Sequence, residues 1–175
     1  MDELKTARLV LRHWRDADLD AFAAMNADPR VTQFLDGRPY VREESAAQMA
    51  RFMRHWDEHG FGLWVAQWRE GGDMLGFIGC LRHDDWVASP YDAEIGWRLA
   101  PAVWRQGLAT EGARAALDHG FRALGFERVI SITRPDNVAS RRVMEKIGLH
   151  LEGEAHWRGR DVVWYAVRRP DWETR

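Results

Sequence analysis

Apolar and polar residues recur along this chain with two different periods, and these periods predict the order of its elements. Short runs with β-branched or apolar residues at every second position predict strands over 8–14, 63–68, 74–81, 93–99, 129–133, 149–152 and 162–168. Apolar residues three and four positions apart predict helices over 16–26 and 43–58, a helix whose apolar face runs from Ala113 to Leu124, and a short helix opened by Pro135-Asp136-Asn137. The order β-α-α-β-β-β-α-β-α-β-β predicts a mixed α/β (α+β) fold, in which a mixed, twisted sheet carries helices on both faces.

Glycine residues mark the ends of several of these elements. Gly71 and Gly72 separate the second and third predicted strands, and a tight turn there needs the positive φ that glycine adopts. We therefore expect these two strands to form an antiparallel hairpin. Gly125 and Gly148 follow the last apolar positions of two helices and are expected to end them.

Composition and charge narrow the function without identifying it. The chain has 175 residues, 46% of them apolar and 30% charged, with no internal repeat or linker, so we expect one globular domain over 1–175. The net charge of −2 offers no electrostatic reason for nucleic acid or an anionic membrane as a partner. A single cysteine and a start without the basic and apolar regions of a signal peptide favour a cytoplasmic protein. No apolar stretch approaches the roughly 18 residues that a membrane span needs.

The segment most informative about chemistry lies between a predicted strand and the third predicted helix. It reads Trp104-Arg105-Gln106-Gly107-Leu108-Ala109-Thr110-Glu111. Gly107 and Ala109 let backbone amides approach a ligand, and the helix that follows directs its N-terminal N–H groups and positive dipole end at the same place. This pattern indicates a pyrophosphate site, although an ordinary glycine-containing turn accounts for the loop alone equally well. It lacks the glycine spacing of dinucleotide loops and the Gly-Lys-Ser/Thr of nucleoside triphosphate loops.

Several segments around this loop carry a family resemblance when they are taken together. In order along the chain they are Ile95-Gly96-Trp97-Arg98-Leu99, Pro101, the loop over 104–111, Asn137-Val138-Ala139-Ser140 and Lys146-Ile147-Gly148-Leu149. Their order and spacing resemble those of the GNAT superfamily of acyl-CoA-dependent N-acyltransferases. The opening Thr6-Ala7-Arg8-Leu9-Val10-Leu11-Arg12, together with Asn137 and Ser140, resembles the branch that includes ribosomal-protein N-terminal acetyltransferases. The resemblance extends over about 6–169.

The resemblance implies acetyl-CoA as co-substrate and a set of residues that bind it. The strand over 93–99 is similar to the splayed family strand whose backbone holds the pantetheine arm, and the loop is similar to the family's pyrophosphate loop. The implied acetyl-CoA-binding residues are Trp97, Arg98, Leu99, Arg105, Gln106, Gly107, Leu108, Ala109, Thr110, Asn137 and Ser140. Two positions depart from the family pattern. Trp104 replaces a common Gln or Arg, and Met144 replaces the tyrosine with which many members protonate the departing thiolate.

The implied reaction is direct attack of a primary amine on the thioester in a ternary complex. Ser140 is this branch's usual substitute for the missing tyrosine, and its hydroxyl is expected to donate a hydrogen bond to the sulfur. A backbone N–H near Trp97 is expected to stabilise the oxyanion. Glu94, at the start of the splayed strand, is the candidate base, with a solvated strand carboxylate as the alternative interpretation. The acceptor stays open between a protein N-terminus, an amino acid and another small amine, and a homodimer is the default assembly.

Other functions stay open on the sequence alone. An acyl-CoA-binding module without catalysis would keep the loop and lose the amine site. His55, Glu58 and His59 match the H-x-x-E-H pattern of zinc peptidases. Gly60 ends that helix at once and no third ligand follows, so two solvated histidines are the simpler interpretation and no metal is expected. Cys80 lies in an apolar strand, which favours a buried structural cysteine over an acyl-cysteine mechanism.

Tryptophan is unusually frequent, with ten residues against seven Phe and three Tyr. Trp97 and Trp104 fall in the implied acetyl-CoA segments, where a flat ring can wall a pantetheine slot. Packing in the core or on a sheet face is expected for the four on predicted strands, Trp14, Trp64, Trp68 and Trp164. An acceptor groove or dimer surface competes with scattered surface aromatics as the interpretation of the four near element ends, Trp56, Trp86, Trp157 and Trp172.

Overall fold

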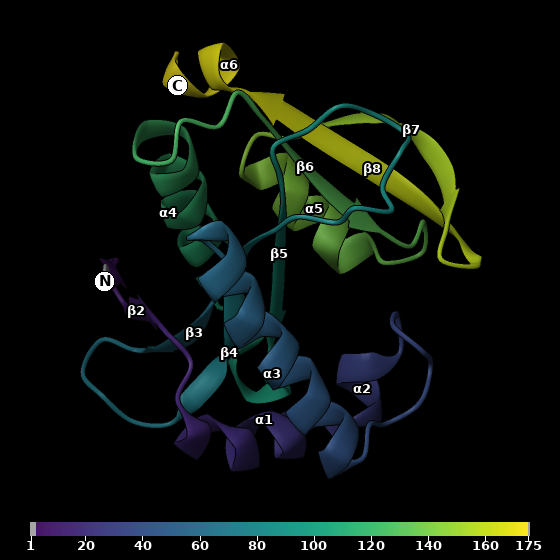
Figure 1. Cartoon of the computed structure of the whole chain (residues 1–175). Coiled ribbons are helices and arrows are strands. Elements are labelled where there is room, and N and C mark those ends of the chain that lie inside the picture. The colour runs from purple at the N-terminus through teal and green to yellow at the C-terminus, as the bar shows by residue number, and fades with distance from the viewer. Residues whose placement is uncertain (1–2, 175) are drawn as a thin grey trace.

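The computed structural model describes residues 3–174 and is built on one eight-stranded sheet (Figure 1). The strands lie side by side in the order β1-β2-β3-β4-β5-β6-β8-β7. Within the described residues β5 and β6 form the one parallel pair, and all other neighbouring strands are antiparallel, so the sheet is mixed, as predicted. The bounds are Leu4–Lys5 (β1), Leu9–Arg12 (β2), Leu63–Trp68 (β3), Met74–Leu81 (β4), Ala93–Leu99 (β5), Arg128–Thr133 (β6), His150–Trp157 (β7) and Arg160–Arg168 (β8).

Helices cover both faces of this sheet, which confirms the predicted fold class. They are α1 (Leu19–Asn26), α2 (Pro29–Thr32), α3 (Arg42–His59), α4 (Leu108–Arg122), α5 (Val138–Lys146) and α6 (Arg169–Glu173), with 3-10 turns at Asp16–Asp18 and Pro101–Val103. On one face, α4 buries Phe121 in the same core as Ile95 of β5. On the other face, α1 and α3 bury Phe22 and Phe52 against Phe77 of β4, and Figure 1 shows α3 lying across this part of the sheet. No helix among residues 3–174 is long and apolar enough to cross a membrane.

The predicted strands over 63–68, 74–81 and 93–99 coincide with β3, β4 and β5. The first strand is shorter than predicted, because β2 ends at Arg12. Trp14 is buried beyond that end, where its indole N–H donates to Leu63 O (2.8 Å). The elements β1, α2 and α6 have only 2, 4 and 5 residues, which is too short to show a period in the sequence.

β7 is longer than the predicted strand over 149–152. Its side chains are mostly exposed, so no apolar period marks it in the sequence. It is held instead by pairing with β8 through the two-residue turn Arg158-Gly159, where both residues have positive φ (50° and 75°). Such turns match the twist of the two strands that they join, and the pairing therefore continues up to the turn.

Trp86 corrects one expectation about the tryptophans near element ends. It lies in the 82–92 connection between β4 and β5, yet only 5% of its surface is exposed. It packs edge-to-face against Trp157 and Trp164, with ring centroids 5.6 and 6.0 Å apart. Figure 1 shows this connection crossing over β6 and β8. Trp86 is therefore no surface aromatic, and it anchors the connection to the sheet.

Candidate active site

β5 leaves its parallel neighbour soon after the two strands meet. β6 pairs with β5 only through Ala93 and Glu94, whereas β5 stays paired with β4 as far as Leu99. The Ser131 hydroxyl of β6 donates to Ile95 O (2.8 Å) at the place where the strands separate. The C-terminal half of β5 is therefore hydrogen-bonded to a strand on one side only.

The hydrogen bonds show which backbone groups of β5 face this divergence. Cys80, opposite Ile95 on β4, donates its N–H to Gly62 O, on the side away from β5. Ile95 therefore turns its N–H and C=O toward β6, which agrees with the bond that it accepts from Ser131. Because backbone direction alternates along a strand, Trp97 directs its N–H and C=O the same way. The backbone of Trp97 thus faces the space between the diverging strands.

The loop expected to bind pyrophosphate joins β5 to α4. Its backbone has positive φ at Arg105 (61°) and at Gly107 (79°), and Gly107 is the N-cap of α4. The helical hydrogen bonds begin with Glu111 N–H donating to Gly107 O, so the N–H groups of the three residues between them have no partner within the helix. The Trp104 indole N–H donates to Leu99 O (2.6 Å) and ties the loop to the end of β5. The loop therefore presents free amides at a positive helix end.

Glu111 fastens this loop to the N-terminal segment. One carboxylate oxygen accepts hydrogen bonds from the Thr6 hydroxyl (2.6 Å) and the Arg8 N–H (2.8 Å), and the other accepts from Arg8 Nε (2.7 Å). Arg8 also donates from Nη1 to Gln106 O in the loop (2.9 Å). Burial opposes the charge of Glu111, but these hydrogen bonds hold its pKa below the ordinary value. The helix dipole alone does not account for Glu111, and the partner Arg8 lies 103 residues away, beyond the reach of local pattern.

The start of α5 places two of the expected residues beside the diverging strands. Asn137 Oδ1 accepts the Ser140 N–H (3.2 Å), and Asn137 Nδ2 donates to Thr133 Oγ1 at the end of β6 (3.0 Å). The Ser140 hydroxyl makes no hydrogen bond with any residue from 3 to 174, and Ser140 is half-buried. Met144, at the position where the family often has tyrosine, is buried in the core. Ser140 is therefore the hydroxyl that α5 brings to this place.

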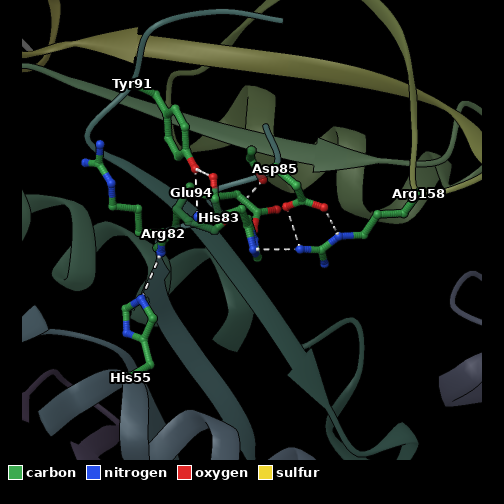
Figure 2. Close-up of polar contacts among 9 residues, drawn as sticks. His55, Arg82, His83, Asp85, Tyr91, Glu94 and Arg158 are labelled. Atoms are coloured by element: carbon green, nitrogen blue, oxygen red, sulfur yellow. Dashed lines mark hydrogen bonds and ion pairs between the residues drawn. The ribbon is translucent and has the colours of Figure 1, made fainter. Parts of the chain in front are cut away.

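Glu94 pairs with a histidine that sequence reasoning missed. His83 Nε2 lies 2.7 Å from Glu94 Oε2, and their side chains are only 13% and 15% exposed, so Glu94 is not a solvated strand carboxylate (Figure 2). Tyr91 closes the 82–92 connection on itself, because its hydroxyl accepts the His83 N–H (2.7 Å) and donates to His83 O (2.5 Å). Trp86 and Tyr91 thus hold His83 against β5.

A second ion pair stands beside His83. Arg158, in the β7–β8 turn, binds Asp85 through Nε (2.7 Å) and Nη2 (2.8 Å), and its Nη2 lies 3.4 Å from His83 Nδ1 (Figure 2). Because arginine only donates, Nδ1 is the acceptor in this contact and the imidazole proton lies on Nε2. His83 then donates its Nε2–H to Glu94 Oε2.

A cleft of about 640 Å³ brings these groups together. Its lining includes Glu94 and His83 at one part, the β5 residue Trp97, and Asn137 with Ser140 from α5. The loop over 105–110 follows β5 but does not line this cleft. The proposed base, the open backbone of β5 and the free hydroxyl therefore share one space.

The comparisons with known proteins agree with this arrangement. A family model described as Acetyltransferase (GNAT) domain matches residues 8–150. The chain belongs to the GNAT acetyltransferase family. It is 31% identical over 153 residues to the uncharacterized N-acetyltransferase YoaA of Bacillus subtilis (strain 168), covering 86% of this chain and 84% of that one.

Solved GNAT structures share the fold. The acetyltransferase from Agrobacterium tumefaciens str. C58 superposes with a TM-score of 0.83 at 28% identity, covering 96% of this chain and 95% of that chain. RimL, a ribosomal L7/L12 alpha-N-protein acetyltransferase solved with coenzyme A, has a TM-score of 0.78 at 20% identity over 95% and 98% of the two chains, which is a likeness of fold. This protein is accordingly an acyl-CoA-dependent N-acyltransferase.

Within this GNAT fold, the residues expected to bind acetyl-CoA fall into two groups and one outlier. The first group is the loop, in which Leu108 is 1% exposed and offers only its backbone. The second is the backbone of β5 at Trp97 and Leu99, with Asn137 and Ser140; the Leu99 side chain is 5% exposed, and its C=O accepts the Trp104 indole N–H. Arg98 is the outlier, because its side chain leaves β5 on the face of α1 and α3 and donates to residues of those helices. Its guanidinium is therefore not part of the pyrophosphate loop.

The structure argues against two alternatives to direct acyl transfer, which are the zinc-peptidase interpretation and an acyl-cysteine mechanism at Cys80. Both ring nitrogens of His55 are engaged by backbone, with Nδ1 donating to Phe61 O (2.8 Å) and Nε2 accepting the Arg82 N–H (3.0 Å), so the zinc interpretation with Glu58 and His59 is wrong. Among residues 3–174 no group of three His, Cys, Asp or Glu is arranged to hold a metal ion. Cys80 is 2% exposed, and burial raises the pKa of its thiol, so it is the structural cysteine that the sequence predicts.

Proposed function

We propose that this acetyltransferase moves an acetyl group from acetyl-CoA to a primary amine by direct attack in a ternary complex. The observation that carries the proposal is the cleft in which the His83–Glu94 pair, the Trp97 backbone and the Ser140 hydroxyl meet. An acyl-CoA-binding module without catalysis would need the loop but not a buried carboxylate–imidazole pair beside it.

The residues present fit acetyl-CoA as co-substrate. The N–H groups at the start of α4 and the positive-φ backbone of Arg105 and Gly107 suit a pyrophosphate, and the free edge of β5 at Trp97 suits the amide groups of a pantetheine arm. Asn137 and Ser140 would stand at the thiol end of that arm. Acetyl-CoA supplies an acyl group that is already activated as a thioester.

Glu94 is the group that takes the proton from the amine. His83 holds Glu94 Oε2, which leaves Oε1 to accept a proton from the amine directly or through one water. His83 acts here as a positioning residue, because its Nε2–H orients the carboxylate. The Arg158 contact at Nδ1 keeps the imidazole in that tautomer.

Trp97 and Ser140 complete the reaction at the thioester. The Trp97 N–H would donate to the carbonyl oxygen, on which negative charge develops as the amine nitrogen bonds to the carbonyl carbon. The Ser140 hydroxyl would donate to the sulfur as the carbon–sulfur bond breaks. A thiol with a pKa of roughly 8.5 leaves readily as thiolate, so a hydrogen bond suffices where the family tyrosine is replaced by Met144.

The deciding experiment measures free thiol released from acetyl-CoA in the presence of a panel of primary amines. The panel holds an N-terminal peptide of a ribosomal protein, amino acids and small amines without other charges. We expect amine-dependent thiol release, intersecting initial-rate lines for the two substrates, and unchanged turnover in Cys80→Ala. Tight coenzyme A binding with no release for any amine would contradict the proposal and favour the silent binding module.

A further inference from the structure

Arg98 lines the cleft and forms no ion pair with a carboxylate among residues 3–174. Its side chain lines the cleft on the same face of β5 as Glu94, since both positions are even-numbered along the strand. Its Nη1 donates to Asn26 Oδ1 (2.9 Å) and Gln48 Oε1 (2.8 Å), and its guanidinium lies over the Phe77 ring, 5.0 Å from the centroid. All three partners are neutral.

The carboxylates of the cleft already have partners other than Arg98 and Arg51. Glu94 binds His83, Asp36 binds Arg160 Nη2 (3.0 Å), and Glu44 binds Arg38. The other arginines of the cleft divide into those that pair with a carboxylate and those that do not. Arg158 and Arg134 have Asp85 and Asp136 as partners, whereas neither Arg98 nor Arg51 pairs with a carboxylate among residues 3–174.

Arg98 and Arg51 both line this cleft. Arg51 follows Gln48 by three positions on α3, which places both on one side of the helix. Burial lowers the pKa of Arg98 to about 10; Tyr40 and Asp36 oppose this shift, and the charge of Arg51 adds to it. Two guanidinium groups in one cleft that pair with no carboxylate among residues 3–174 make a site that an anion would stabilise.

We propose that Arg98, assisted by Arg51, binds a carboxylate of the acceptor, so that preferred acceptors are amines that also carry a carboxylate. This inference rests on the proposed function and adds the substrate class to it. The Asn26 and Gln48 amides hold Nη1, which leaves Nη2 and Nε to form the two-nitrogen fork that matches a carboxylate. Arg98 is then a specificity residue for the reaction at Glu94.

The separation of Glu94 and Arg98 along β5 indicates how long the acceptor is. Glu94 and Arg98 stand four positions apart, or about 13 Å along the strand, since a strand rises about 3.3 Å per residue. An amine at Glu94 and a carboxylate at Arg98 therefore belong to a molecule with several bonds between them. A short peptide or a long ω-amino acid fits this spacing better than glycine does.

The first measurement compares matched amines on the wild-type protein. A series of ω-amino acids with two to seven methylene groups is assayed against the alkylamines of the same length, with phosphorylated alkylamines as a third arm. We expect kcat/KM to favour the carboxylate over the plain amine by about 10- to 100-fold at the best length, the range of a charged hydrogen bond. Equal rates for the two arms, or a preference for the phosphorylated arm, would overturn the inference.

The second measurement uses variants. Arg51→Gln should raise KM for the best ω-amino acid while leaving KM for the matched alkylamine within about twofold. Arg98→Lys should reduce the preference for the ω-amino acid over the alkylamine, and Arg98→Gln should erase it altogether. Arg54→Gln, an exposed arginine one turn along α3 that does not line the cleft, is the matched control and should behave as wild type. Because Arg51 is exposed, its variant tests the inference even where Arg98→Gln lowers stability.

Calorimetric binding of the ω-amino acid to the protein with coenzyme A gives a readout that needs no turnover. Binding that weakens about tenfold in Arg51→Gln and not in Arg54→Gln supports the carboxylate site. Binding that is absent, or equal in all variants, overturns it. If every amine fails to release thiol while this binding persists, the proposed transfer is wrong and the carboxylate site stands.

Discussion

The hydrogen bonds of Glu111 predict that the substitution Glu111→Gln lowers the stability of the fold. In Glu111→Gln the amide oxygen can still accept from the Thr6 hydroxyl and the Arg8 N–H, but the amide NH₂ then faces Arg8 Nε, so one hydrogen bond is lost. The two retained bonds change from charged to neutral acceptors.

The expected size follows from these changes. Replacing a charged acceptor by a neutral one weakens each retained bond by about 1 kcal/mol. The Arg8 side chain is 45% exposed, so its ion pair adds under about 1 kcal/mol after screening. We expect the free energy of unfolding to fall by about 2 kcal/mol and Tm to fall by about 4–8 °C for a chain of this size.

The same change should act on one substrate only. Arg8 holds Gln106 O in the loop, so its release should raise KM for acetyl-CoA severalfold and leave KM for the amine unchanged. Thermal melts and two-substrate kinetics test this, with Glu58→Gln, an exposed helix carboxylate, as the control that removes the same charge. An unchanged Tm in Glu111→Gln, or a change confined to the amine KM, would refute the reasoning.

Three further predictions follow from the site and its charges. Ser140→Ala should lower kcat by at most about 10²–10³-fold, because one lost oxyanion-type donor costs roughly 2.7–4 kcal/mol of transition-state stabilisation. Unchanged turnover would remove Ser140 from the mechanism. Glu94→Gln should lower kcat/KM by about 10²-fold or more near neutral pH and move the rise in rate to higher pH, where more of the amine is already neutral; a pH–rate profile of wild-type shape would sink the base assignment. The pKa of Glu111 is lowered in the folded state, so its contribution is present above the ordinary value of 4.5 and is lost as pH falls through the folded value. Chemical denaturation from pH 7 to pH 3 should therefore show the wild type and Glu111→Gln converging in stability on acidification, and a constant difference would argue against this linkage.

Local pattern predicted the centre of the sheet well. β3, β4 and β5 coincide with the predicted ranges because every second residue enters the core beneath α4; in β3 and β4 the residues between enter a second core, beneath α1 and α3. β7 was predicted too short because pairing with β8, and not burial, holds most of its length. Trp86 was misjudged for a related reason, since a loop residue gives no period and its burial depends on Trp157 and Trp164 far along the chain.

The residues of the candidate site also divide into those that local sequence indicated and those that only the fold brought together. Sequence alone pointed to the loop at Gly107, to Ser140 and to Glu94, because motif order and spacing are written along the chain. His83 and Arg8 were missed, because each meets its carboxylate only after a connection folds back or the two ends of the chain come together.

The sequence by itself determined the element order, the loop before α4 and the family to which the chain belongs. Only the tertiary structure decided that Glu94 is paired with His83 and that Arg98 has no carboxylate partner among residues 3–174. The physical reason is that periodicity reports which side of an element is buried, whereas charge balance depends on which side chains from distant segments meet there. In this protein those meetings take place in one cleft, and they determine what it can bind.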